Sequence, residues 1–218
     1  MISSDIRWDI KSEMTTKKCL IIGFGPGWTD YPQDYEGEVW GLNTASLLCP
    51  RLDRLFLADR IEDKTVIRQG FYEPAFGSDK NKKVSIDVEG FKQNIRDRNI
   101  PFVSCHPYPD VPTCEVYPLK EIVEAFGSDY FSNCIAYMIA YAIWKGFKEI
   151  ELIGIRQGLL TEYAFHKGSV EFWIGMAVGH GINVKITGDS HLLRTPDWRL
   201  YGYKKTLEEL KNNNYKVN

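Results

Sequence analysis

In the stretch CLIIGFGPGW, residues 19–28, a run of four apolar residues leads directly into a turn with three glycines. Apolar runs of this length suit a strand buried on both faces of a parallel sheet, and open α/β sheets bind ligands at the carboxyl ends of their strands. Glycines there let backbone N–H groups approach a phosphate closely. Because the turn has neither a full GxGxxG pattern nor a Walker lysine, two interpretations stay open: a tight turn without a ligand, or a phosphate site made by Gly23, Gly25, Pro26 and Gly27.

Five more apolar runs follow along the chain, and helical segments separate them. A helix is expected after Ser132, where apolar residues recur at helical spacing until Gly146, and a second helix from about Ser169 to Val178. This alternation predicts an α/β domain with a doubly wound, mostly parallel sheet. The five runs are residues 39–42, 55–57, 102–104, 150–153 and 184–186.

The length of 218 residues suits one α/β domain with an insertion. Residues 1–17 form a polar tail, residues 18–205 the domain, and residues 206–218 a short helix with a tail. Between about residues 60 and 100 the pattern is weak, which indicates an insertion or a lid-like excursion.

The composition is that of an ordinary globular protein, with 44% hydrophobic, 13% aromatic and 26% charged residues. It excludes a wholly disordered, fibrous or coiled-coil chain. A formal net charge of -2 argues against nucleic acid as a partner. The five cysteines show no CxxC pair, and neither a signal peptide nor a transmembrane segment is visible, so a cytoplasmic protein with reduced thiols is expected. The aromatic residues leave a homo-oligomer open.

Polar residues follow two of the expected strands. Asn43 comes directly after the second run and could bind a base, a ribose or a phosphate, or cap the next helix. Asp59 follows the third run and could hold a ribose hydroxyl or a metal-bound water, or cap a helix. Both would lie at the same edge of the sheet as the glycine turn.

Two further groups of polar residues accompany the later elements. Ser132 and Asn133 precede the long helix, where they are good caps and could also meet an anionic ligand. Arg156 follows the run at 150–153, and a loop with Tyr163 and His166 comes next. Arg156 could neutralise a phosphate, and Tyr163 or His166 could move a proton. The alternative is a solvated loop.

The histidine spacings match no metal motif, so no protein metal site is predicted. A Mg²⁺ ion bound together with substrate phosphates would leave little trace in the sequence. Neither a Gly-x-Ser-x-Gly elbow nor a cysteine-nucleophile signature is present, which disfavours a serine or cysteine hydrolase.

The ordered segments LIIGFGP (20–26), WGLN (40–43), FSNCIAYM (131–138), KGFKEIELIGI (145–155) and YAF (163–165) resemble a Rossmann-like superfamily. This superfamily contains the bacterial lipooligosaccharide sialyltransferases, the archaeal-type 6-hydroxymethyl-dihydropterin pyrophosphokinases and many uncharacterised phage and bacterial proteins. The small phage members are the most similar in character. The resemblance covers roughly residues 18–190 and implies a single Rossmann-like domain.

The resemblance implies that the glycine turn and Asn43 contact the phosphate and sugar of a nucleotide, and that Ser132 and Asn133 line the same cleft. In the sialyltransferase branch a loop histidine and nearby tyrosines serve donor departure and acceptor deprotonation, which points to His166 and Tyr163. Two positions depart from the family pattern. Gly27 replaces a serine after Pro26, and Arg156 stands where the family has an acid.

Three functions remain as hypotheses. The first is a nucleotide-dependent transferase, a sialyltransferase-like glycosyltransferase with a nucleotide-sugar donor and a glycan or small-molecule acceptor. The second is an ATP- and Mg²⁺-dependent pyrophosphokinase that uses Asp59. The third is a non-catalytic protein that binds a nucleotide or a sugar phosphate.

Overall fold

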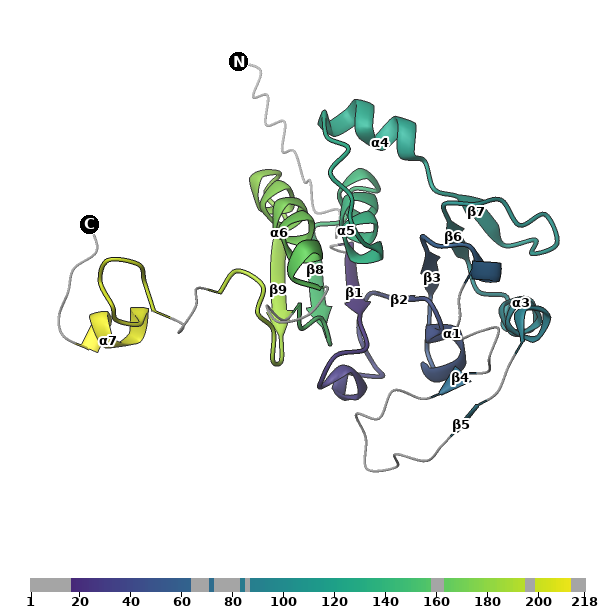
Figure 1. Cartoon of the computed structure of the whole chain (residues 1–218), viewed down its shortest axis with the longest axis horizontal. Helices are drawn as coiled ribbons and strands as arrows, with labels where there is room; N and C mark the ends of the chain where they lie inside the picture. The colour runs from purple at the N-terminus through teal and green to yellow at the C-terminus, as the bar shows by residue number, and fades with distance from the viewer. Residues whose placement is uncertain are drawn as a thin grey trace, which may run out of the picture.

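A seven-stranded parallel sheet forms the centre of the computed structural model, with the strand order β7-β6-β3-β2-β1-β8-β9 (Figure 1). The structure describes residues 17–63, 71–72, 83–84, 87–157, 163–194 and 199–212. The strands of the sheet are β1 (Lys18–Ile22), β2 (Glu38–Leu42), β3 (Arg54–Leu57), β6 (Phe102–Ser104), β7 (Cys114–Val116), β8 (Glu149–Ile153) and β9 (Asn183–Thr187). All six predicted strands are therefore confirmed, and β7 is an addition.

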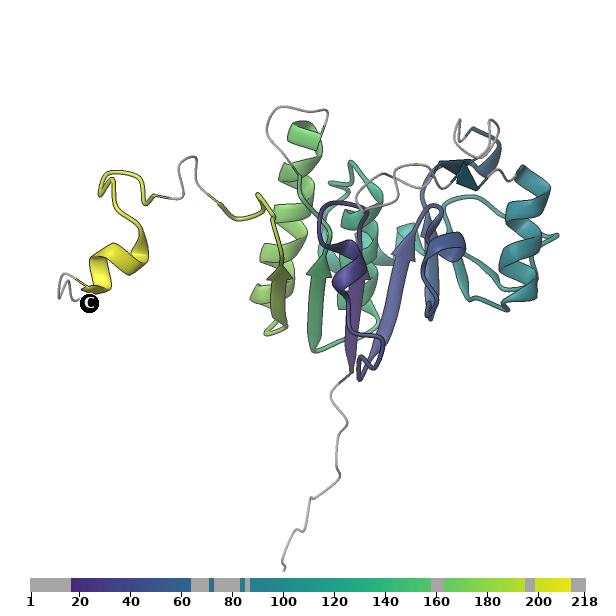
Figure 2. The same cartoon turned by 90° about the horizontal axis from the view of Figure 1, so that it is seen from below.

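The helices are α1 (Ala45–Leu48), α3 (Val88–Asp97), α4 (Leu119–Phe126), α5 (Cys134–Trp144), α6 (Tyr163–Gly179) and α7 (Leu207–Asn212). Two short 3₁₀ helices, η1 (Trp28–Asp30) and η2 (Ile61–Asp63), follow β1 and β3, and β4 (Phe71–Tyr72) pairs with β5 (Lys83–Val84). Figure 2 shows α7, in yellow, standing apart from the sheet.

Helices cover both faces of the sheet, as the predicted doubly wound fold requires. Successive residues of a strand point to opposite faces. In β1, Cys19 and Ile21 pack into the cluster formed with α5 and α6, and Leu20 and Ile22 pack into the cluster that contains α3 residues. The four apolar residues of β1 are therefore consecutive because the strand is buried on both faces of the sheet.

The interval from about 60 to 100, expected as a weakly patterned insertion, contains a regular crossover helix. Helix α3 is capped by Asp87, whose side chain accepts a hydrogen bond from Gly90 N. It buries Phe91 and Ile95 completely against the sheet. Residues 88–97 of this interval therefore form a helix that the weak pattern did not reveal, because its two fully buried apolar residues lie one helical turn apart among mostly polar neighbours. The predicted polar tail lies almost entirely outside the described residues.

Within the described ranges, no helix has both the length and the apolar character needed to cross a membrane.

The buried cysteine after α1 makes stability depend on alkaline pH. Burial raises the pKa of the Cys49 thiol to about 11, against a smaller opposing effect of the Arg98 guanidinium. The thiol of the unfolded chain ionises at about pH 8.5, well before that of the folded chain. Rising pH therefore stabilises the unfolded chain relative to the folded chain and lowers the free energy of unfolding.

We therefore expect ionisation of Cys49 to cost about 3 kcal/mol of folding free energy between about pH 8.5 and pH 11, and nothing below that range. Urea unfolding of wild type and Cys49→Ala across this pH range measures the effect. The variant should show a shallower decline, and parallel pH profiles would contradict the assignment.

Candidate functional site

The chain changes direction within the sheet between β1 and β8. From β1 it proceeds outward through β2, β3, β6 and β7, and then returns to place β8 on the other side of β1 and β9 beyond it. In open α/β folds, the crevice at the carboxyl ends of the two strands flanking such a reversal is where ligands bind. This edge is the candidate functional site.

The glycine turn after β1 crosses the segment after β8 at close backbone distance. Gly23 N donates to Ile153 O at 2.8 Å, and Gly25 N donates to Gly154 O at 2.6 Å. A Cβ atom on Gly23 or on Gly25 would lie 2.6 Å from the Gly154 carbonyl oxygen, which no side chain can tolerate. The glycines are therefore required by the crossing of two backbone segments.

This crossing decides between the two interpretations of the turn for two of its residues. The amide groups of Gly23 and Gly25 are engaged by backbone carbonyls, so they are not available to a phosphate. Gly27 has a left-handed backbone with φ of 81° and leads into η1, which has only three residues. The tight-turn interpretation therefore holds for Gly23 and Gly25.

Two carboxamides flank the glycine turn. Asn43 directly follows β2, and Gln157 comes four residues after β8, so they belong to the two strands that pair with β1. Both have left-handed backbones, with φ of 52° and 50°. Asn43 Oδ1 and Gln157 Oε1 are buried and accept no hydrogen bond from any described residue. A buried carbonyl oxygen without a donor is costly, so a further hydrogen-bond donor at either atom would stabilise the site.

Trp28 adds a third such atom at the same place. It packs against Gly154, where a Cβ would lie 2.6 Å from the Trp28 Cβ. Its Nε1 is buried and, within the part of the chain that the structure describes, donates to no acceptor. The turn thus lies among two acceptors and one donor that the fold leaves unsatisfied.

Arg156 lies beside the crossing and is exposed. Its Nε is 3.4 Å from Asp189 Oδ2, an ion pair between the segments that follow β8 and β9. The backbone around Arg156 is held by two further contacts: Ser190 Oγ donates to Ile155 O at 2.7 Å, and His191 N donates to Arg156 O at 2.8 Å. The guanidinium is therefore anchored at the candidate edge with one face paired and the rest open to solvent.

Ser132 and Asn133 join the start of α5 to the start of α6. Asn133 Oδ1 accepts from Ala136 N at 3.0 Å as the helix cap, and its Nδ2 donates to His166 O at 3.2 Å. Ser132 Oγ forms a short hydrogen bond with Ser169 Oγ. The sequence left open whether these residues cap the helix or contact a ligand. In the structure Asn133 caps α5, and both side chains connect α5 to α6.

The predicted loop around His166 is helical, which corrects the expected start of this helix near Ser169. Helix α6 begins at Tyr163, and His166 therefore lies in its first turn. Gly168 lies inside this helix, and a Cβ there would be 2.6 Å from the Tyr130 hydroxyl oxygen, so the packing of Tyr130 requires a glycine. Lys167 pairs with Glu171 at 3.0 Å. The Tyr163 side chain lies outside the described part of the chain.

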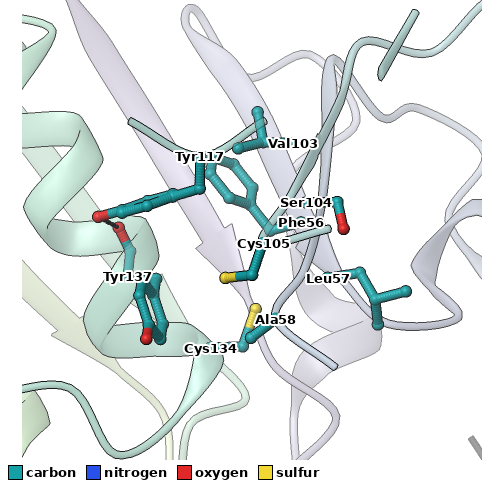
Figure 3. Close-up of a pocket in the computed structure, with 9 residues that line it drawn as sticks. All are labelled: Phe56, Leu57, Ala58, Val103, Ser104, Cys105, Tyr117, Cys134 and Tyr137. Carbon is teal, nitrogen blue, oxygen red and sulfur yellow. Dashed lines mark hydrogen bonds between the residues drawn. The ribbon is translucent and has the colours of Figure 1, made fainter. Parts of the chain in front are cut away.

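Asp59 lies at the edge of the sheet beyond β3, near a small cavity. It is exposed, and its charge contributes, after burial, to raising the pKa of Cys105. The cavity has a volume of about 10 Å³ and lies between the ends of β3 and β6 and the first turns of α5 (Figure 3). Its lining residues are Phe56, Leu57, Ala58, Val103, Ser104, Cys105, Tyr117, Cys134 and Tyr137.

A larger cleft of about 390 Å³ opens farther along the same edge. Lys92 lies in its wall, with its Nζ 2.9 Å from Asp110 and 3.7 Å from Glu62. These ion pairs already balance the charge of Lys92. The cleft is lined by Arg60, Glu62, Lys92, His106, Pro107, Tyr108, Pro109 and Asp110.

The structure thus assembles the predicted residues into two groups. The glycine turn, Asn43 and Arg156 lie at the reversal of the sheet, whereas Ser132, Asn133 and His166 meet at the α5–α6 junction. No group of three or more His, Cys, Asp and Glu side chains in the described ranges could hold a metal ion. Gln157 was not predicted. Its only signal in the sequence was a polar residue shortly after an apolar run, which is the feature that identified Asn43.

No protein-family model matches the chain, and no curated protein matches its sequence. Among solved structures, it is similar to the sialyltransferase CstII from Campylobacter jejuni in complex with cytidine-5'-monophosphate, with a TM-score of 0.45 and 15% identity over 78% of this chain and 79% of that chain. A CST-II complex with a trisaccharide acceptor and CMP gives a TM-score of 0.47 and 14% identity, over 78% and 80% of the two chains. A CST-II variant in complex with CMP gives 0.48 and 14%, over 93% and 100%.

The backbone crossing predicts a specific sensitivity at Gly154. Its φ is 67°, and a Cβ there would lie 2.6 Å from both Gly23 O and Trp28 Cβ. We expect Gly154→Ala to lower the free energy of unfolding by about 2–4 kcal/mol, through the strained backbone and the forced displacement of packed neighbours. Urea unfolding measures the loss.

The matched control is Gly175→Ala in the middle of α6, where a Cβ would meet no atom within 4 Å. It should raise stability by up to about 1 kcal/mol because alanine favours the helix. Equal effects of the two substitutions would contradict the role of the crossing.

The helix junction predicts a stabilising role for Asn133. Asn133→Ala removes the cap of α5 and the hydrogen bond to His166 O, and should lower the free energy of unfolding by about 1–2 kcal/mol. Asn133→Ser keeps a capping oxygen but not the link to His166, so it should lose less. Chemical denaturation of the three proteins separates the two contributions, and wild-type stability in the alanine variant would overturn the assignment.

Proposed function

We propose that the protein is a nucleotide-sugar-dependent glycosyltransferase whose donor nucleotide binds at the carboxyl edge of the sheet around the glycine turn. The observation that carries the proposal is the pair of buried, unsatisfied carboxamide oxygens of Asn43 and Gln157 on either side of β1. Adjacent strands are about 4.8 Å apart, so strands β2 and β8 are about 10 Å apart across β1, a span that a nucleotide can bridge.

The residues at this edge suit the binding of a nucleotide in several ways. Ribose hydroxyls and the exocyclic amine of a base are donors that can satisfy the two carboxamide oxygens. Arg156 supplies a fixed positive charge for the leaving phosphate, and its pair with Asp189 orients the guanidinium. Glycosyl transfer creates negative charge on that phosphate, so a cation placed there would accelerate the departure of the nucleotide.

The acceptor hydroxyl requires a base, and we assign this role to His166 or Tyr163. Both belong to the first turn of α6, and Asn133 and Ser169 hold the backbone of His166 through its carbonyl oxygen. These two hydrogen bonds fix the position of His166 at the start of α6, and histidine is the residue that most often serves as a general base. The ordered sequence motifs resemble the superfamily that contains the bacterial lipooligosaccharide sialyltransferases, which supports a transferase that uses a nucleotide-linked donor.

A thermal-shift screen of the purified protein distinguishes the three hypotheses, since a ligand that binds the folded state raises the melting temperature. The compounds are CMP, CDP, UDP, ADP, ATP and CMP-sugars, each with Mg²⁺ and with EDTA. Stabilisation by cytidine nucleotides in EDTA supports the proposal. Stabilisation by ATP only with Mg²⁺ would instead support pyrophosphoryl transfer at Asp59, and tight binding without turnover of any donor would support a binding protein.

Gln157 provides the sharpest test of the site. Gln157→Met replaces a buried acceptor that has no partner with an apolar side chain of similar shape, so the free protein should be as stable as wild type or more stable. The affinity for the stabilising nucleotide should fall about tenfold, which corresponds to about 1.4 kcal/mol for one lost hydrogen bond. Calorimetric titration and urea unfolding measure the two quantities.

Gln93→Met makes the same chemical change on the exposed side of α3 and should leave the affinity unchanged. A Gln157→Met protein that is less stable and binds the nucleotide normally would show that this carboxamide has a structural role.

A further inference from the structure

Two cysteines line one small cavity at the carboxyl edge of the sheet. Cys105 directly follows β6, and Cys134 is the first residue of α5. Both line the cavity of about 10 Å³, which has room for about one water-sized probe. Figure 3 shows the side chains of both cysteines at this cavity, with the Cys134 sulfur pointing toward Cys105. Both cysteines are half-buried, so small solutes can reach the pair from solvent.

The surroundings of the pair agree with this placement. Tyr117 and Tyr137 line the same cavity, and both cysteines contribute, after burial, to raising the pKa of each of these tyrosines. The cavity that both cysteines and both tyrosines line is the geometric basis for this placement. Residues 105 and 134 are brought together only by the packing of α5 on the sheet.

The other three cysteines are excluded as partners by their positions. Cys114 pairs with Phe102 in the sheet, three residues before Cys105, and packs in the cluster on the opposite face. Cys49 belongs to that opposite cluster too. Cys19 is fully buried inside β1, three residues before the end of that strand.

We propose that Cys105 and Cys134 form an oxidisable dithiol that hydrogen peroxide converts into an intramolecular disulfide. In the first step the Cys134 sulfur attacks one oxygen of the peroxide, the O–O bond breaks, and Cys134 becomes a sulfenic acid with the release of water. In the second step the Cys105 sulfur attacks the Cys134 sulfur, the S–O bond breaks, and the departing oxygen leaves as water with the Cys105 proton. Two thiols and one peroxide thus give one disulfide and two waters.

The order of the two steps follows from the environments of the thiols. Burial, assisted by Asp59, raises the pKa of Cys105, so this thiol stays protonated and reacts second. Cys134 is the first residue of the eleven-residue helix α5 and is assigned the first step. The resulting bond would connect the end of β6 to the start of α5, next to the Asn133 link to α6.

The test is oxidation of the reduced full-length protein with hydrogen peroxide, followed by alkylation of the remaining thiols and peptide mapping without reductant. The expected product is a cross-link between the tryptic peptides that contain Cys105 and Cys134, which dithiothreitol reverses. Cys105 and Cys114 lie on the same tryptic peptide, because no Lys or Arg separates them. The Cys114→Ser variant therefore assigns the link, and should form it as efficiently as wild type.

Cys105→Ser and Cys134→Ser should each form the cross-link at least about tenfold less efficiently. Three outcomes would overturn the proposal: a cross-link that is lost in Cys114→Ser, conversion of Cys134 to a sulfinic acid without a cross-link, or oxidation of Cys114 while Cys105 and Cys134 remain reduced. The first outcome requires the Cys114→Ser variant, whereas the wild-type map alone reveals the other two, so the test stands even if a variant fails to fold. It needs no nucleotide and is independent of the proposed function.

Discussion

The structure depends on the contact of two backbone segments at the centre of the sheet. The turn after β1 and the turn after β8 approach so closely that Gly25 N reaches Gly154 O at 2.6 Å. Strand β1 is the strand at which the order of the sheet reverses, and its partner β8 begins the part of the sheet on the other side of that reversal. The crossing therefore connects the parts of the sheet on either side of the reversal at their carboxyl edge. Only residues without a Cβ allow this approach.

This constraint shapes the chemistry of the edge. Since the amides of Gly23 and Gly25 are used to hold the crossing together, the capacity for ligand binding shifts to the side chains around it. Asn43 and Gln157 are held in left-handed conformations with buried oxygens that the described residues leave unsatisfied. Such strain and such unsatisfied atoms are costly, and they concentrate where a protein binds its ligands.

The opposite arrangement holds at the α5–α6 junction, where polar groups satisfy one another. Three side chains, those of Ser132, Asn133 and Ser169, converge on the His166 carbonyl oxygen. A stack of aromatic rings lies against this junction, with Phe131 between Tyr137 at 4.4 Å and Trp173 at 4.9 Å. The first turn of α6 is thereby fixed relative to α5. The cavity lined by Cys105 and Cys134 lies beside the same first turn of α5. Hydrogen bonds therefore fix α5 to α6 next to the two thiols that we propose to be oxidisable.

The sequence by itself determined the class of fold and the edge that carries the site. Apolar runs such as residues 19–22 mark strands buried on both faces, and a parallel sheet brings the residues after them, Asn43 among them, to one edge. It also located α5 closely, because its apolar pattern ends at Gly146. These features are local, so a single stretch of chain contains all the information they need.

Only the tertiary structure decided what the special residues do. The glycines of the first turn suit a phosphate site and a close backbone crossing equally well, and the distinction depends on Gly154, which is more than 120 residues away. The need for a glycine at position 168 also comes from a distant residue, because the Tyr130 hydroxyl occupies the space of a Cβ. The roles of Ser132 and Gln157 and the pairing of Cys105 with Cys134 likewise depend on which distant atoms lie within hydrogen-bonding or bonding reach. A linear pattern does not contain that information.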